Sequence, residues 1–210
     1  MNAIEAKALL TQKLDIYRKQ FWGGLIVLSV AILIFLVDLV LDYSMIDPQW
    51  ASILLLVSIV VLCLGLYLLR NTLPLRLTLR RCLNKLEERG LLEEAATALN
   101  APEEALLGGV CSVSGGYLFS SEKGVILPVS ELGWIYFHHM GNRKLDLVAE
   151  VNTWGTRYFS LLSLSEKANQ TEVNELLQQA EALFPNALIG YSKENRAAWK
   201  ALCAQRKQGN

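Results

Sequence analysis

Two adjacent histidines, His138 and His139, are the side chains best suited to metal binding or acid–base chemistry, and the chain has no others. The surrounding stretch LPVSELGWIYFHHM, residues 127–140, predicts a strand, in which successive side chains point to opposite faces. The two histidines would therefore diverge, and neither has Cys, Asp or Glu two residues away. We expect no metal or catalytic centre, only a strand that ends in a polar hairpin at Gly141–Asn142. One face would carry Leu132, Trp134, Tyr136 and His138, and the other Gly133, Ile135, Phe137 and His139.

The cysteines also fail to form a recognisable site. Cys63, Cys82, Cys111 and Cys203 are too far apart for a CxxC pattern, and zinc sites need clustered or regularly spaced ligands. We expect four unpaired thiols in a reducing compartment. The sequence has no HExxH motif, phosphate-binding glycine loop or Ser-His-Asp set. We therefore predict that the protein is not an enzyme, and nothing in the sequence indicates a cofactor.

Charge and hydropathy narrow the class of protein. The chain has 20 basic and 20 acidic residues, so it lacks the surplus of Lys and Arg that nucleic-acid binding requires. Hydrophobic residues make up 52 % of the chain, and most of the excess lies between Phe21 and Leu69. We predict no nucleic-acid partner and a membrane location.

Two uncharged runs, residues 21–37 and 50–69, have the length of membrane spans. About 20 apolar residues cross the hydrocarbon core as a helix. Aromatic residues flank both runs, as in an interfacial belt: Trp22 and Tyr43, then Trp50 and Tyr67. A cleaved signal peptide is the competing interpretation of the first run, but that run begins late and no small-residue cleavage pattern follows it.

Lys and Arg set the expected orientation. Residues 1–21 and 70–85 are rich in bases, whereas the link 42–50 has Asp42 and Asp47 and no base. The positive-inside rule then places both termini in the cytoplasm and the link outside. We predict a protein integral to the plasma (inner) membrane with two spans that form a helical hairpin.

Asp38 and a basic cluster are the candidate polar sites at the membrane. Asp38 interrupts the first run, and we favour a solvated interfacial aspartate over a proton or ion relay because no second charge lies in either span. The cluster gives candidate contacts to anionic lipid, although topology alone would explain it. Its members are Arg70, Arg76, Arg80, Arg81 and Lys85.

The remaining helices follow from apolar periodicity. Residues 2–20 predict an amphipathic helix that starts with a capping box at Asn2 and Glu5 and lies either on the inner leaflet or on the cytoplasmic domain. Residues 78–99 predict a helix that breaks near Gly90. Two further helices should be capped by Asn169 or Thr171 and by Ser192. The stripe of the first is Val173, Leu176, Leu177, Ala180, Leu183 and Phe184, and Trp199, Leu202 and Cys203 should face inward from the second.

Short strands dominate the C-terminal part. Two antiparallel hairpins are predicted, one from YLFSS and VILPV and the other from LGWIYFHH and KLDLVAEV. A further strand, TRYFSLLS, follows them, and NALIGY adds a short strand. We expect five to seven strands over residues 105–190, closed by the amphipathic helix. The chain then divides into an N-terminal helix (1–20), a transmembrane hairpin (21–69), a basic helical linker (70–103) and a cytoplasmic domain (104–210).

Two stretches carry a resemblance to a known family. KGVILPVSELGWIYFHH places a strand, a Pro128–Ser130 step and a second hydrophobic strand in succession, and ALIGYSKENRAAWK follows later. This pattern resembles bacterial two-span membrane proteins with a C-terminal pleckstrin-homology-like (PH-like) domain. The resemblance implies an α+β cytoplasmic domain, a PH-like antiparallel β-roll closed by a helix, and it gives no activity to carry over to this chain. Lipid-binding members of the wider class use several bases in the first hairpin, where residues 114–124 offer only Lys123.

Two functions fit these features. The first is a membrane-anchored cytoplasmic interaction module without catalysis, whose partners are the bilayer and another membrane or cytoplasmic protein, or a second copy. The alternative is a small accessory subunit of a transporter or other membrane complex. That role would use Asp38 or small residues at helix contacts, namely Gly23, Gly24, Ser58 and Gly65.

Overall fold

The structure is a computed structural model that describes residues 1–40, 48–140, 144–151, 158–165 and 167–208, with the side chains of 38–40, 48–52, 54, 140 and 206–208 left out. The chain forms two compact units. One unit is Ile16–Leu77, and the other combines Met1–Asp15 with Thr78–Asn210. We call them the hairpin unit and the folded unit. The Gly141–Asn142 turn, residues 42–47 of the acidic link and the NTWG turn lie outside the described residues.

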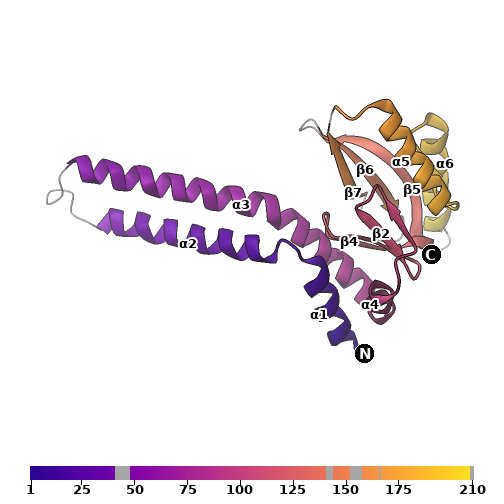
Figure 1. The fold of residues 1–210 in the computed structure, drawn as a ribbon, viewed down its shortest axis with the longest axis horizontal. Coiled ribbons are helices and arrows are strands. Elements are labelled where there is room, and N and C mark those ends of the chain that lie inside the picture. The colour runs from indigo at the N-terminus through magenta and orange to yellow at the C-terminus, as the bar shows by residue number, and fades with distance from the viewer. Residues whose placement is uncertain (41–47, 141–143, 152–157, 166, 209–210) are drawn as a thin grey trace. The chain divides into compact units, whose positions relative to one another are not determined.

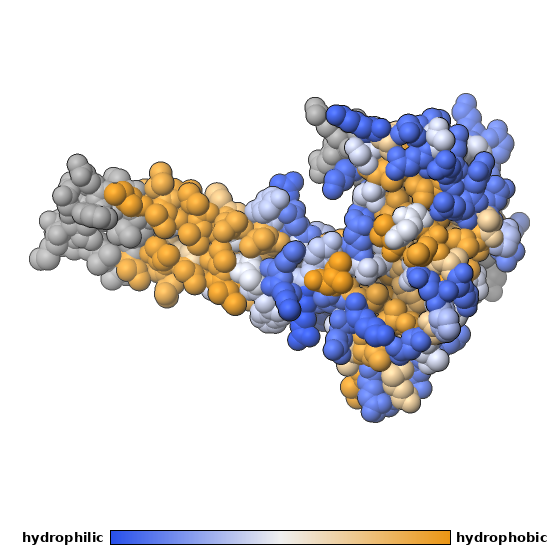
Figure 2. All heavy atoms as spheres, viewed as in Figure 1, coloured by the Kyte–Doolittle hydropathy of each residue, from blue (hydrophilic) through white to orange (hydrophobic). Residues whose placement is uncertain are grey.

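Two long helices form the hairpin unit: α2 (Arg18–Val40) and α3 (Pro48–Glu88), of which the part up to Leu77 belongs to this unit (Figure 1). Both are long and apolar enough to cross a membrane. Their hydrophobic side chains are largely exposed, and Figure 2 shows them gathered along these helices. The first part of the segment expected as a basic helical linker, residues 70–88, continues α3, which contains Pro74.

Small residues let α2 and α3 approach closely. A Cβ on Gly24 would lie 2.9 Å from Leu68 Cβ, and one on Gly65 would lie 3.0 Å from Leu28 N. Ser58 is buried, and its hydroxyl donates to Leu55 O at 2.8 Å. Gly23 has nothing within 4 Å of its Cβ position, so it does not belong to this contact between α2 and α3.

The N-terminal helix belongs to the folded unit. α1 (Ala3–Leu14) begins at the predicted Asn2–Glu5 capping box and buries Ala6, Leu10 and Leu14 in the core of that unit. Lys7 Nζ pairs with Glu87 Oε2 at 2.5 Å. Of the two expected positions, packing on the domain is therefore the observed one. The helix ends before residue 20, because Asp15 caps it and α2 starts at Arg18.

Two four-stranded sheets form the centre of the folded unit. The first is an antiparallel meander of β1 (Ala105–Leu107), β2 (Cys111–Ser114), β3 (Tyr117–Ser120) and β4 (Val125–Pro128). The second has the order β7-β6-β5-β8, built from β5 (Leu132–Met140), β6 (Lys144–Val151), β7 (Phe159–Ser165) and β8 (Leu188–Ile189). The two predicted hairpins are confirmed. The described residues contain eight strands rather than five to seven, because the short strands β1 and β2 add to those expected.

Three helices complete the folded unit: α4 (Leu92–Asn100), α5 (Gln170–Leu183) and α6 (Lys193–Gln208). Asn169 and Ser192 cap α5 and α6 as predicted. The break before α4 is also confirmed, since α3 ends at Glu88 and Gly90 takes φ +69°. Together with α1 and the end of α3, α4 and α5 bury apolar side chains in one continuous core with both sheets.

A second apolar cluster lies on the opposite face of the β5–β6 sheet. It contains Trp134, Tyr136, Val148 and, from α6, Trp199. Cys203 packs against this cluster as expected, but Leu202 is 39 % exposed, so its predicted inward orientation is wrong.

Candidate functional site

The two histidines are neighbours on β5 and have different partners on β6. His138 pairs across the sheet with Asp146, and His139 pairs with Leu145. The His138 ring lies 5.6 Å from the Tyr158 ring. Among the described residues, no three His, Cys, Asp or Glu side chains are placed to hold a metal ion.

The predicted faces of the histidine strand need one correction. A register shift between Leu132 and Trp134 puts a bulge at Gly133. Leu132 consequently packs in the main core with Ile135, whereas Trp134 and Tyr136 belong to the opposite cluster. A bulge adds one residue to the strand, so the alternation of faces fails across it.

The four cysteines all lie within the described residues, and none of them forms a disulfide. Cys82 and Cys111 are buried, Cys203 is half-buried and Cys63 is exposed. Burial raises the pKa of the Cys111 thiol to about 11, so it stays protonated at neutral pH. A protonated, buried thiol is a poor nucleophile.

The five basic candidates for lipid contact all lie on α3. Arg70, Arg80 and Arg81 are exposed. The Arg76 guanidinium lies 4.3 Å from the centre of the Phe21 ring, and Lys85 Nζ pairs with Glu88 Oε2 at 2.7 Å. Asp38 falls within α2, but its side chain is outside the described part of the chain.

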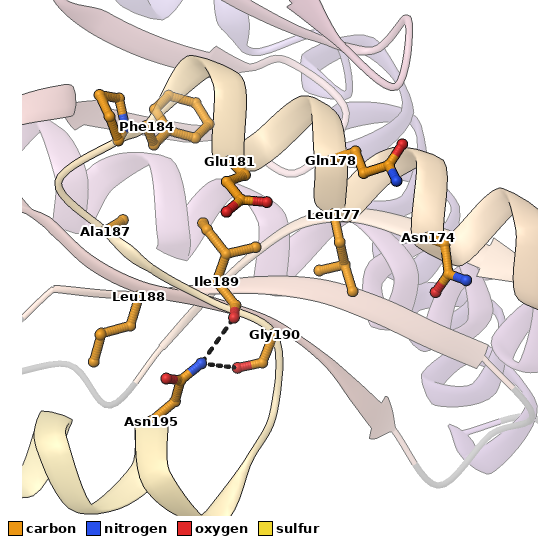
Figure 3. A pocket seen from close by; sticks show the side chains of 11 residues that line it. Asn174, Leu177, Gln178, Glu181, Phe184, Ala187, Leu188, Ile189, Gly190 and Asn195 are labelled. Carbon is orange, nitrogen blue, oxygen red and sulfur yellow. Dashed lines mark hydrogen bonds between the residues drawn. The ribbon is translucent and has the colours of Figure 1, made fainter.

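A groove with a volume of about 510 Å³ lies between α5 and β8, and we call it the β8 groove. In Figure 3, side chains of α5 form one wall of the groove and the segment 187–190 forms the other. The Asn195 side chain lies at the groove from the start of α6. Leu177 and Glu181 point from α5 toward the strand. The groove is also lined by Asn174, Gln178, Phe184, Pro185, Ala187, Leu188, Ile189 and Gly190.

β8 pairs with β5 through only one side of its backbone. The register is parallel, with Trp134 opposite Leu188 and Ile135 opposite Ile189, and Gly190 N–H donates to Ile135 O at 2.8 Å. Backbone groups alternate in direction along a strand, so Ile189 turns its N–H and C=O away from β5. The Asn195 side chain donates to Ile189 O at 2.8 Å and to Gly190 O at 3.1 Å. β8 is thus an edge strand whose C-terminal end is closed by a side-chain amide.

The lining of the groove combines apolar and neutral polar groups with one carboxylate. Leu177 and Ile189 supply half-buried apolar surface, and Asn174, Gln178 and Asn195 supply amides. Glu181 is the one ionisable side chain among the lining residues that the structure describes. An arrangement of this kind can bind an extended chain, because it offers hydrogen-bonding groups and apolar contacts side by side.

A smaller cavity of about 450 Å³ opens beside α6, against Trp134, Glu150 and Trp199. The Glu150 carboxylate accepts from the Tyr136 hydroxyl at 2.7 Å and from Trp199 Nε1 at 2.5 Å. Burial raises the pKa of the Tyr136 hydroxyl, and its bond to Glu150 raises it further. These bonds tie α6 to the sheet, so we assign this carboxylate a structural role.

The sequence did not reveal the β8 groove, because its walls come from residues 174–195 of three elements. The short strand in NALIGY and the cap at Ser192 were both expected, but the role of Asn195 was not. The one available signal was the position of Leu177 at the margin of the apolar stripe of α5. In the structure Leu177 is half-buried: it packs against the edge of the core and also lines the groove.

Comparisons with protein families, curated proteins and solved structures gave no match. The class of site therefore follows from geometry alone. In the β8 groove, an edge strand lies beside a wall of apolar and amide side chains, and this arrangement favours the binding of an extended chain.

Proposed function

We propose that the protein is a membrane-anchored interaction module, in which the hairpin unit holds the chain in the bilayer and the folded unit binds another protein without catalysis. The observation that carries this proposal is the β8 groove, where an edge strand stands beside apolar and amide side chains. Edge strands are ready templates for pairing with another chain.

The proposal includes a location. Both termini lie in the cytoplasm, at the inner membrane of a bacterial cell. Support comes from the basic residues on either side of the two spans and from their absence in the link between them. Three exposed arginines, Arg70, Arg80 and Arg81, supply contacts to anionic lipid, each worth about 1 kcal/mol.

We also propose that the folded unit is a PH-like β-roll. The order of elements supports this assignment: four antiparallel strands, then the meander of β5, β6 and β7, then α5. In this scheme β8 and α6 are additions at the C-terminal end. The β8 groove lies where the first addition meets the closing helix.

The alternative function is an accessory subunit that uses its helices to contact other membrane proteins. Exposed apolar side chains such as Leu33 and Leu56, at 63 % and 65 %, would serve either lipid or a partner helix. Gly24 and Gly65 are already used between α2 and α3, so of the three glycines in these helices only Gly23 remains open to such an interface. We therefore prefer the interaction module.

Co-purification in mild detergent tests the choice between these functions. Glu181→Lys reverses the charge in the groove, whereas Glu175→Lys makes the same change on α5 outside the groove lining. We expect a partner protein to accompany the wild type and Glu175→Lys and to be strongly depleted with Glu181→Lys. Equal recovery with all three proteins, together with loss on replacement of Leu33 and Leu56 by polar residues, would favour the accessory subunit.

A further inference from the structure

We infer that the β8 groove receives a short extended segment of a partner protein, which pairs in parallel with β8 and places a lysine or arginine beside Glu181. This inference rests on the proposed function and adds the geometry and charge of the partner. It follows from three features of the groove: the direction of the β8 backbone groups, the closure at Asn195, and the charge of α5.

The backbone groups of β8 match a parallel partner. In a parallel ladder, one residue of the incoming strand donates to the carbonyl before its partner residue and accepts from the N–H after it. Around Leu188 these groups are the Ala187 carbonyl and the Ile189 N–H, both of which point away from β5 because Leu188 and Gly190 face it. Antiparallel pairing at this edge would need both backbone groups of Ile189. The Ile189 carbonyl already accepts from Asn195, so the parallel arrangement is favoured.

The paired segment must be short. At one end, Asn195 Nδ2 holds the Ile189 and Gly190 carbonyls, and Trp134 Nε1 donates to Gly190 O at 2.9 Å. At the other end lies Pro185, which has no N–H to donate. The open edge between these ends is only a few residues long, which also limits indiscriminate strand pairing.

The charge of α5 selects a basic partner. The helix sequence QTEVNELLQQAEAL contains Glu172, Glu175 and Glu181 and no Lys or Arg. Of these, Glu181 lines the groove and projects toward the strand (Figure 3). A positive side chain on the incoming segment would complement this carboxylate, and an apolar neighbour would contact Leu177 and Ile189.

A randomised peptide-display library, panned on the full chain in lipid nanodiscs, tests the inference. We expect the enriched peptides to carry Lys or Arg next to apolar residues. A synthetic peptide of the enriched sequence should bind the wild type and Glu175→Lys, and bind Glu181→Lys more weakly. No enrichment over empty nanodiscs, or enrichment of acidic peptides, would overturn the inference.

Proline at position 189 tests the backbone pairing. Ile189→Pro removes the one backbone N–H of β8 that faces away from β5 and leaves the bonds between β8 and β5 in place. Ile189→Val keeps that N–H. Because one hydrogen bond is lost, the affinity of Ile189→Pro for the synthetic peptide should fall by about fivefold to tenfold. The affinity of Ile189→Val should stay near that of the wild type. If Ile189→Pro does not fold, N-methylation of the peptide at its pairing residue should give the same loss.

Binding that survives both N-methylation and proline would contradict strand pairing. Enrichment of segments of this chain itself would contradict a different protein as partner and would indicate a second copy. If no peptide binds while partner co-purification still depends on Glu181, the inference of an extended segment fails and the proposed function stands.

Discussion

At the scale of single residues, Gly133 explains how α6 can lie so close to β5. A Cβ at Gly133 would stand 2.0 Å from Cζ3 of Trp199, so only glycine fits under that ring. Trp199 in turn donates to Glu150, which also accepts from Tyr136. The bulge, the indole and the carboxylate therefore position α6, and α6 supplies Asn195 to the β8 groove.

Gly133→Ala should destabilise the folded unit by about 1–3 kcal/mol, the usual cost of overpacking a core. Urea unfolding followed by tryptophan fluorescence would measure the change. Ser130→Ala, at an exposed position nearby, is the matched control and should lie within about 0.5 kcal/mol of the wild type. An unchanged midpoint for Gly133→Ala would contradict the packing of Trp199 on β5.

Tyr117 should make the folded unit sensitive to alkali. Its side chain is buried, and burial, followed by the nearby Glu94 carboxylate, raises its pKa from 10.0 to about 12. A raised pKa in the folded state stabilises the protein below the unfolded value of 10.0, and this contribution is lost as the pH rises toward about 12. Tyr117→Phe should therefore reduce the fall in melting temperature as the pH rises from 10.0 toward about 12. The same change at the exposed Tyr191 should leave the fall unaltered, and an identical decline in Tyr117→Phe would contradict this account.

At the scale of elements, the structure separates what local sequence patterns can predict from what they cannot. The caps at Asn2, Asn169 and Ser192 and the two hairpins depend on neighbouring residues, and all were predicted. The face of Leu132 depends on a bulge, and the side of Leu202 on how α6 meets the sheet. The β8 groove depends on three elements meeting, which no local pattern encodes.

The packing of α5 predicts the order in which substitutions on this helix lower the stability of the folded unit. Leu176 is buried at 6 %, Leu177 is half-buried in the groove wall, and Gln178 is exposed. Leu176→Ala should cost about 2–5 kcal/mol, and Leu177→Ala should cost less because its side chain already meets solvent. Gln178→Ala should be nearly neutral. Thermal unfolding of the three variants measures this order, and a larger loss for Leu177→Ala than for Leu176→Ala would contradict the observed orientation of α5.

At the scale of the whole molecule, the proposed roles of the two units, anchoring by the hairpin unit and protein binding by the folded unit, depend on membrane topology. The apolar hairpin exposes its side chains, as a bilayer requires, while the folded unit has a core of its own. Alkaline phosphatase, which is active only outside the cytoplasm, should be inactive when fused after Asn210. The same enzyme fused after Met45 of a truncated chain is the positive control. High activity of the Asn210 fusion would contradict a cytoplasmic folded unit.

The central claim is that the folded unit contacts its partner through the β8 groove, and photo-crosslinking in living cells tests it most directly. A photoreactive amino acid at Gln178, within the groove lining, should give a discrete crosslinked product with another protein. The same substitution at Glu175, on α5 outside that lining, should give little, and at Leu33 it should give mainly lipid adducts. Protein crosslinks from Leu33 with none from Gln178 would contradict the claim.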